Sequence, residues 1–138
     1  MKISTKSQYG LRAMSYLTEK NEKGKVSSLN EIAEAENIPA DYLEKIMGNL
    51  RESNLVESKK GAGGGYTLAR KPKKISVKDI IDAVGEMEGL VECLKEGKRN
   101  CKYEKHCVVK VVWEKLEKSL YSTLESIKLS DLDHSNKN

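Results

Sequence analysis

The sequence predicts a mainly α-helical protein with one small β-hairpin and a long helix near its C-terminus. Apolar residues recur at spacings of three and four along most of the chain. A glycine-rich, basic segment separates two short strand-like stretches. A late apolar stripe over 107–127 is longer than one helix can bury by itself. With 138 residues, the chain can form one domain, or a small domain with an appendage.

Local signals predict two helices in the first part of the chain. The first is expected over 5–20, where an apolar stripe follows the candidate caps Ser4 and Thr5. The second is expected over 29–36, because Ser28 and Glu31 form the S-x-x-E pattern of a capping box just ahead of apolar residues.

A third helix is expected after a break at Asn37 and Pro39. Proline disfavours helical geometry in the residue before it but suits the first turn of a new helix. The new helix carries apolar residues at spacings of three and four: Tyr42, Leu43, Ile46, Met47 and Leu50. A short helix, a tight turn and a second amphipathic helix are the outline of a helix-turn-helix.

A β-hairpin is expected at about 55–70, directly after the helix-turn-helix. Leu55–Lys59 and Tyr66–Ala69 are strand-like, and the segment KGAGGG between them supplies four glycines for a tip. From 57 to 74 there are six basic side chains against one acid: Lys59, Lys60, Arg70, Lys71, Lys73 and Lys74 against Glu57. The modest net charge of +4 is therefore concentrated in this region.

The rest of the chain divides into a helix, a loop, a long helix and a tail. Ser76 and Asp79 predict a capped helix over 77–86, which would close a first domain over 1–86. A loop over 87–108, a long helix over 107–130 and a flexible tail over 131–138 follow. Six apolar side chains of the long helix need a partner, either the first helix or a second subunit: Val109, Val112, Trp113, Leu116, Leu120 and Leu124.

Composition argues against several classes of protein. No apolar run approaches the roughly 18 residues of a membrane span, and the N-terminus MKISTKSQYG is polar. A cytoplasmic protein without a membrane partner is expected. The sequence shows no arrangement of nucleophile, base and orienting group, so it does not predict an enzyme. A thiol oxidoreductase would need a C-x-x-C motif, which is absent.

A helix-turn-helix followed by a basic hairpin is a winged helix, which favours binding to double-stranded DNA. The second helix of the motif would enter the major groove, and the hairpin would lie along the phosphate backbone. Helix pairs are also common in all-α proteins, and a lysine run is often only a solvated face. The glycine-rich basic hairpin directly after the second helix favours the DNA-binding interpretation.

The sequence resembles the Rrf2 family of winged-helix transcriptional regulators, which includes the IscR, NsrR, RirA and CymR types. The resemblance lies in MKISTKSQYGLRAM, in IPADYLEKIMGNLRESNLVESKKGAGGGYTLAR and in the clustered cysteines, and it covers nearly the whole chain. It implies a homodimer on a palindromic DNA operator, with the long C-terminal helices crossing as dimerisation helices. The six apolar residues of the long helix would then lie in the dimer interface.

The resemblance also implies a set of DNA-binding residues. The start of the second helix of the motif would contact the major groove, through Ala40, Asp41, Tyr42, Glu44 and Lys45. The wing would contribute Lys60, where other members tend to have Arg, together with Lys59 and Gly61. The remaining candidate phosphate contacts are Arg51, Lys2, Thr5 and Lys6. Tyr9, Leu43, Ile46, Leu50 and Tyr66 are expected in the core.

All three cysteines, Cys93, Cys101 and Cys107, lie in the loop over 87–108. Their spacing, C-x7-C-x5-C, is not the C-x2-C pairing of common zinc modules. Soft thiolates select iron–sulfur clusters, zinc or copper(I). The resemblance implies an iron–sulfur cluster, either 2Fe–2S or 4Fe–4S, whose gain, loss or oxidation switches a repressor or activator.

The fourth ligand of such a cluster is open. Lys110 stands where the IscR type has a histidine, and Gln8 stands where some nitric-oxide sensors have an acid. The nearest imidazole is His106. Two alternatives remain: a structural zinc held by the three cysteines and His106, and a thiol–disulfide switch.

Overall fold

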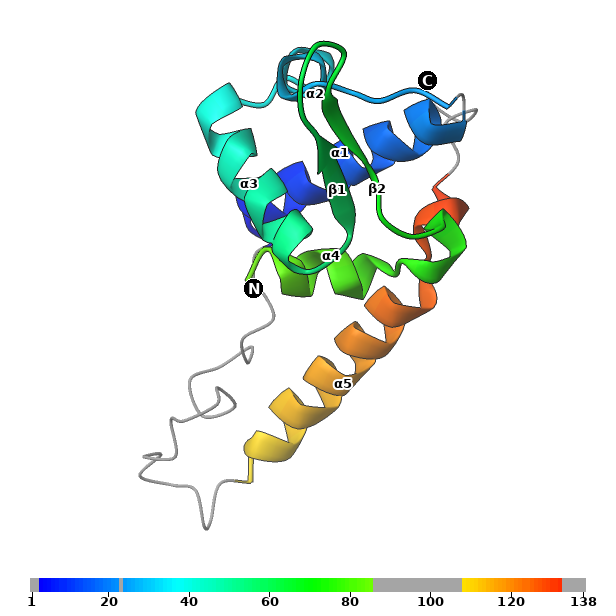
Figure 1. Ribbon diagram of the computed structural model, residues 1–138. Helices are drawn as coiled ribbons and strands as arrows, with labels where there is room; N and C mark the ends of the chain where they lie inside the picture. Colours follow the sequence, from blue (N-terminus) through cyan, green and yellow to red (C-terminus); the bar gives the residue numbers. More distant parts are fainter. Residues whose placement is uncertain (1–2, 23, 86–107, 133–138) are drawn as a thin grey trace.

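The computed structural model describes residues 3–22, 24–85 and 108–132 (Figure 1). The elements follow in the order α1 (Thr5–Glu22), α2 (Leu29–Glu36), α3 (Ala40–Glu52), β1 (Val56–Lys59), β2 (Gly65–Leu68), η1 (Pro72–Lys74), α4 (Val77–Ala83), α5 (Lys110–Ser126) and η3 (Leu129–Asp131). The predicted fold class, mainly helical with one hairpin, is confirmed. No helix in these ranges is long and apolar enough to cross a membrane.

The helix-turn-helix, α2 and α3, is built by the local signals of the sequence. The Ser28 hydroxyl accepts a hydrogen bond from the Glu31 N–H at 3.1 Å and so caps α2. Asn37 ends α2 in the left-handed conformation, at φ 53°, and its N–H bonds the carbonyls of Ala33 and Glu34. Pro39 then stands at the start of α3. The predicted span of α2 and the predicted break are both confirmed.

The wing is a two-stranded antiparallel hairpin tied to the start of α2. Val56 pairs with Leu68 and Lys59 with Gly65, so each strand lies within a residue of its prediction. Ser27 and Tyr66 exchange two backbone hydrogen bonds, at 3.1 and 2.7 Å. A Cβ on Gly65 would lie 2.3 Å from the Ser27 carbonyl oxygen, so this close approach requires glycine. The hairpin is therefore fixed where β2 begins, just after the tip loop.

The core lies around α1, which passes behind the hairpin (Figure 1) and contacts α2, α3, α4 and β2. Leu43, Ile46 and Leu50 are fully buried, as the sequence predicts. Tyr9 and Tyr66 are half-buried and pack against this cluster. The chain has no Phe, and α1 and α3 bury the methionines Met14 and Met47 together with Leu and Ile side chains. The result is an aliphatic core that holds α3 by one face.

Helix α4 is shorter than the predicted 77–86. It begins with the predicted capping box, in which Ser76 and Asp79 exchange backbone and side-chain hydrogen bonds at 2.9 and 3.0 Å. It ends at Ala83, because the chain turns at Gly85, which has φ +83°. The prediction from apolar periodicity extends about one turn too far, because periodicity does not detect a glycine that ends a helix.

Helix α5 extends away from the winged domain (Figure 1). Its main packing within the chain is against α4, rather than against α1. None of its residues is buried. Beyond it, Leu129 returns to the core and is 0% exposed, and Leu132 packs beside that core. The predicted tail, 131–138, therefore overlaps a segment that is packed as far as Leu132; residues 133–138 lie outside the described residues.

Candidate nucleic-acid interface

Helix α3 has one buried face and one free face. The buried face carries Leu43, Ile46, Met47 and Leu50. The predicted DNA contacts of α3 all lie on the free face and are exposed: Ala40, Asp41, Tyr42, Glu44 and Lys45 for the groove, and Arg51 for a phosphate. A helix fixed by one face with polar side chains on the other has the geometry needed to read base edges in a major groove.

A cluster at the start of α3 was not predicted from the sequence. The ring of Tyr42 meets the ring of Tyr9 from α1 edge to face, with centroids 5.5 Å apart. The Arg12 guanidinium lies 5.7 Å above the Tyr9 ring. Arg12 also donates to the Glu36 carbonyl and lies 3.8 Å from the Glu36 carboxylate, at the end of α2. The cluster therefore ties α1 to both helices of the motif, and Tyr42 helps to hold α3 as well as facing solvent.

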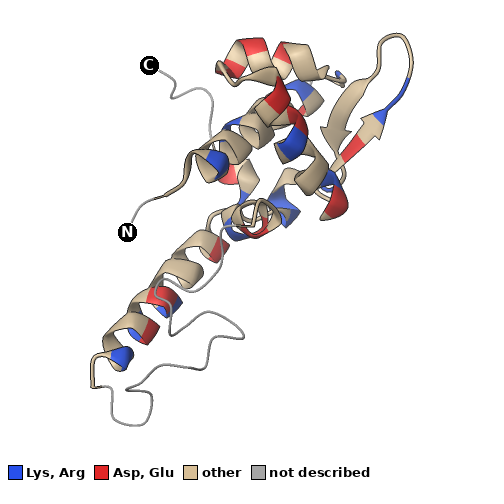
Figure 2. Cartoon of the chain, turned by 90° about the vertical axis from the view of Figure 1, so that its left-hand side faces the viewer, with Lys and Arg blue, Asp and Glu red and all other residues tan. Residues whose placement is uncertain are grey.

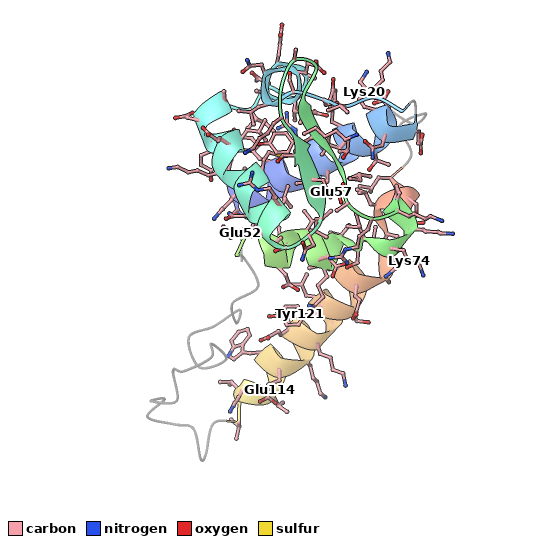
Figure 3. The ribbon with its side chains drawn as sticks, in the orientation of Figure 1. Lys20, Glu52, Glu57, Lys74, Glu114 and Tyr121 are labelled. Carbon is pink, nitrogen blue, oxygen red and sulfur yellow. The ribbon has the colours of Figure 1, made fainter. Side chains whose placement is uncertain are left out.

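The structure divides the six basic residues of 57–74 into three groups. Lys59 and Lys60 are exposed on the wing, next to the exposed Gly61 of its tip. Arg70 donates to the carbonyls of Asn54 and Ser53, both at 3.2 Å, and so fixes the base of the wing. Lys71, Lys73 and Lys74 lie at η1, on the other side of the hairpin from α3, as the position of Lys74 shows (Figure 3).

Basic and acidic residues both occur along α3 and the wing (Figure 2). Lys59 and Lys60 are the basic residues of the wing strand and tip, whereas Glu57 lies lower on the same strand. In the first turn of α1, Thr5 is exposed and Lys6 is half-buried. Lys2 lies outside the described residues. The positive groups near α3 are thus few and separate, which suits individual phosphate contacts rather than one broad basic patch.

The predicted cluster ligands Cys93, Cys101, Cys107 and His106 all lie outside the described residues. Within 3–22, 24–85 and 108–132, no group of three or more His, Cys, Asp or Glu is placed to hold a metal ion. Two positions considered for a fourth ligand do lie in these ranges. Gln8 donates its side-chain N–H to the Ile3 carbonyl at 3.0 Å, and the Lys110 ammonium lies 3.9 Å from the Glu114 carboxylate.

The apolar side of α5 is open to solvent in the single chain. Val109 and Val112 are 51% and 52% exposed, and Leu116 is 37% exposed. Trp113, Leu120 and Leu124 are half-buried. Tyr121 lies closer to α4, where the Lys78 ammonium is 5.7 Å from its ring. Partial burial and a hydrogen bond with Glu117 raise the pKa of Tyr121 to about 12.

The exposed free face of α3, the anchored wing and the projecting helix α5 define a winged-helix DNA-binding regulator. More specifically, the chain belongs to the Rrf2 family, whose sequence profile, described as "Iron-dependent Transcriptional regulator", matches residues 3–135. A curated relative, Protein rrf2 of Nitratidesulfovibrio vulgaris, is 36% identical over 96% of this chain and 87% of its own length.

Two solved structures extend the similarity to the fold. IscR of T. potens superposes with a TM-score of 0.78 at 38% identity, covering 100% of this chain and 93% of that one. CymR, the global cysteine regulator of B. subtilis, superposes with a TM-score of 0.79 at 33% identity, covering 99% of each chain. The chain is accordingly a transcriptional regulator related to IscR and CymR, and not an enzyme.

Proposed function

We propose that this regulator acts in the cytoplasm as a homodimer on a palindromic DNA operator. We further propose that Cys93, Cys101 and Cys107 hold an iron–sulfur cluster whose gain, loss or oxidation changes operator affinity. The observation that carries DNA binding is the exposed polar face of α3 beside an anchored wing with Lys59 and Lys60 at its end. The cluster rests on three thiols within one short loop and on similarity to IscR.

The proposed interface separates base contacts from phosphate contacts. The Glu44 carboxylate is suited to accept a hydrogen bond from a cytosine amino group, and Lys45 to reach guanine acceptors or a phosphate. Lys59, Lys60 and Arg51 neutralise phosphates and release counterions, so affinity should fall steeply as salt rises. Lys60 is also placed to enter the minor groove, where the negative potential is strongest.

The proposed dimer rests on α5. Its exposed valines and Leu116 form an apolar surface that has no cover among the described residues of the chain. A second copy of the same helix would bury this surface on both chains at once, because a two-fold interface uses the same patch twice. The two α3 helices would then face two half-sites of a palindrome.

The chemistry of the donor set fits a cluster. Thiolates are the usual ligands of iron–sulfur centres, and the lysines and arginine around the three cysteines favour the thiolate form. Structural zinc with His106 as fourth ligand, or a thiol–disulfide switch, would use the same cysteines. A cluster or a thiol–disulfide switch would supply a reversible change in the loop that joins α4 to α5, whereas a structural zinc would imply a different signal.

The test is anaerobic purification of the full chain, followed by an absorption spectrum and by iron, zinc and acid-labile sulfide analysis. The proposal expects iron and sulfide in comparable amounts, and loss of both in Cys93→Ala, Cys101→Ala and Cys107→Ala. Operator duplexes selected from a random pool should bind with different affinity before and after removal of the cluster. Stoichiometric zinc without sulfide, or regulation that survives in all three variants, would overturn the cluster.

A further inference from the structure

Helix α5 is attached to the winged domain mainly at one end. Along its 17 residues none is buried, and its packing within the chain is against α4. The segment that follows it, residues 127–132, is different, because it returns to the domain and enters the core (Figure 1). We call this segment the C-terminal anchor.

The C-terminal anchor is held by two backbone hydrogen bonds and one buried side chain. The Val77 N–H donates to the Ile127 carbonyl, and the Leu129 N–H donates to the Ile75 carbonyl, both at 2.8 Å. The Leu129 side chain is 0% exposed in the core, and η3 packs against α1 and η1. These bonds join the end of α5 to the start of α4, although the bonded residues are about 50 positions apart in the sequence.

We infer that Leu129 is a positioning residue that sets the half-site spacing accepted by the dimer. The inference rests on the proposed dimerisation through α5. Since α5 would carry the dimer interface, its direction relative to the winged domain determines where each α3 stands. The C-terminal anchor fixes that direction at the end of α5 nearest the domain.

The length of α5 makes the spacing sensitive to this attachment. A helix of 17 residues is about 25 Å long at a rise of ~1.5 Å per residue. A tilt of about 10° at the anchored end therefore displaces the other end by roughly 4 Å. One base-pair step along DNA is ~3.4 Å. Loosening the C-terminal anchor would therefore allow the position of each α3 along the DNA to vary by about one base pair.

The side contacts of α5 are less buried than the C-terminal anchor. The Lys78 ammonium meets the Tyr121 ring at 5.7 Å and is paired with Asp82 of its own helix at 2.8 Å. No residue of α5 is buried in its contact with α4. The C-terminal anchor, in contrast, has a fully buried leucine and two paired backbone groups.

The test measures spacing preference rather than affinity alone. Duplexes selected from a random pool by the wild-type protein are rebuilt with the two half-sites moved by one and two base pairs in each direction. Two variants loosen the C-terminal anchor: Leu129→Ala, and an insertion of Gly-Gly between Ser126 and Ile127 that leaves Leu129 in place. Leu55→Ala, an equally buried change at the base of the wing, is the matched control.

We expect the wild type and Leu55→Ala to prefer one spacing at least tenfold over its one-base-pair neighbours. Both loosened variants should reduce this preference to threefold or less while binding a single half-site as the wild type does. A tenfold preference retained by the Gly-Gly insertion would overturn the inference and leave the proposed function intact. A wild-type protein that binds duplex DNA with no spacing preference would overturn the inference together with dimeric binding. Circular dichroism melting shows whether Leu129→Ala is folded. If that variant is unfolded, the Gly-Gly insertion alone tests the inference.

Discussion

The winged domain and α5 bury apolar surface in opposite ways. In the winged domain, side chains from α1, α2, α3 and α4 reach 0% exposure, as Met14, Ile32, Ile46 and Ile80 do. In α5, the valines of the first turns are more than half exposed. The first region therefore folds on contacts within one chain, whereas the second has apolar surface left for a partner. Substitutions in the winged domain should accordingly change the free energy of unfolding, whereas substitutions in α5 should change the association of two chains.

The largest expected effect is loss of a core side chain from α3. Ile46→Ala should lower the free energy of unfolding by about 2–5 kcal/mol, because it removes a fully buried side chain and leaves a cavity. Urea unfolding followed by circular dichroism measures this. Val112→Ala, which trims a 52% exposed side chain, is the control and should change the unfolding free energy little at protein concentrations where the chain is monomeric. Equal losses in both variants would remove the contrast between the regions.

A charge on α5 should affect association and leave the winged domain folded. Val112→Asp would place a carboxylate in the proposed dimer interface without a partner, so the monomer–dimer dissociation constant should rise at least tenfold, or about 1.4 kcal/mol. Sedimentation equilibrium measures the constant, and operator affinity should fall with it. Val112→Ile is the matched control. An unchanged dimer in Val112→Asp would show that association uses another surface.

A smaller effect is expected from single wing lysines. Lys60→Ala should weaken duplex binding and lower the slope of log affinity against log salt by about 1, because one phosphate contact is lost. Lys74→Ala removes the same charge at η1, away from α3, and should leave the slope unchanged. Binding titrations at several salt concentrations compare the two. Equal slopes for both variants would argue that net charge, rather than position, drives binding.

The smallest effect concerns the contact between α4 and α5. The pKa of Tyr121 is raised to about 12 from an ordinary value of 10.0, so the folded protein holds this proton more tightly than the unfolded chain. The stabilisation is present below pH 10 and is lost as pH rises toward 12. Urea midpoints at pH 9 and pH 11 should therefore differ more in the wild type than in Tyr121→Phe. An identical difference in both would assign the pH dependence to other groups, including Lys78, whose pKa is also raised by its bond to Asp82.

Short-range signals predicted the fold well. Ser28, Asn37 and Pro39 act on neighbouring backbone, so the helix-turn-helix follows from the sequence nearly residue by residue. The free face of α3 follows from the apolar stripe on its other side. The exposure of the candidate DNA-contacting residues of α3 and the wing therefore follows from the amino-acid pattern alone.

Long-range contacts were not predictable in this way. Arg12 meets Glu36 across 24 residues, and Leu129 meets Ile75 across more than twice that separation. Periodicity describes which face of an element is apolar but does not identify the element that covers it. For that reason the sequence predicts a flexible tail from residue 131, and it does not distinguish Arg70, which bonds the backbone below the wing, from the other basic residues of 57–74.

The two backbone bonds between Ser27 and Tyr66 have a practical consequence for protein engineering. They hold the hairpin where β2 begins, just after the tip loop, whereas Gly61 and Ala62 of that loop are exposed and a Cβ on Gly61 would meet nothing within 4 Å. A cysteine-reactive fluorophore attached through Ala62→Cys would therefore sit on the wing tip, close to this fixed point of the backbone. Its emission could report the approach of DNA in real time, and the tip itself could be exchanged between regulators as a cassette.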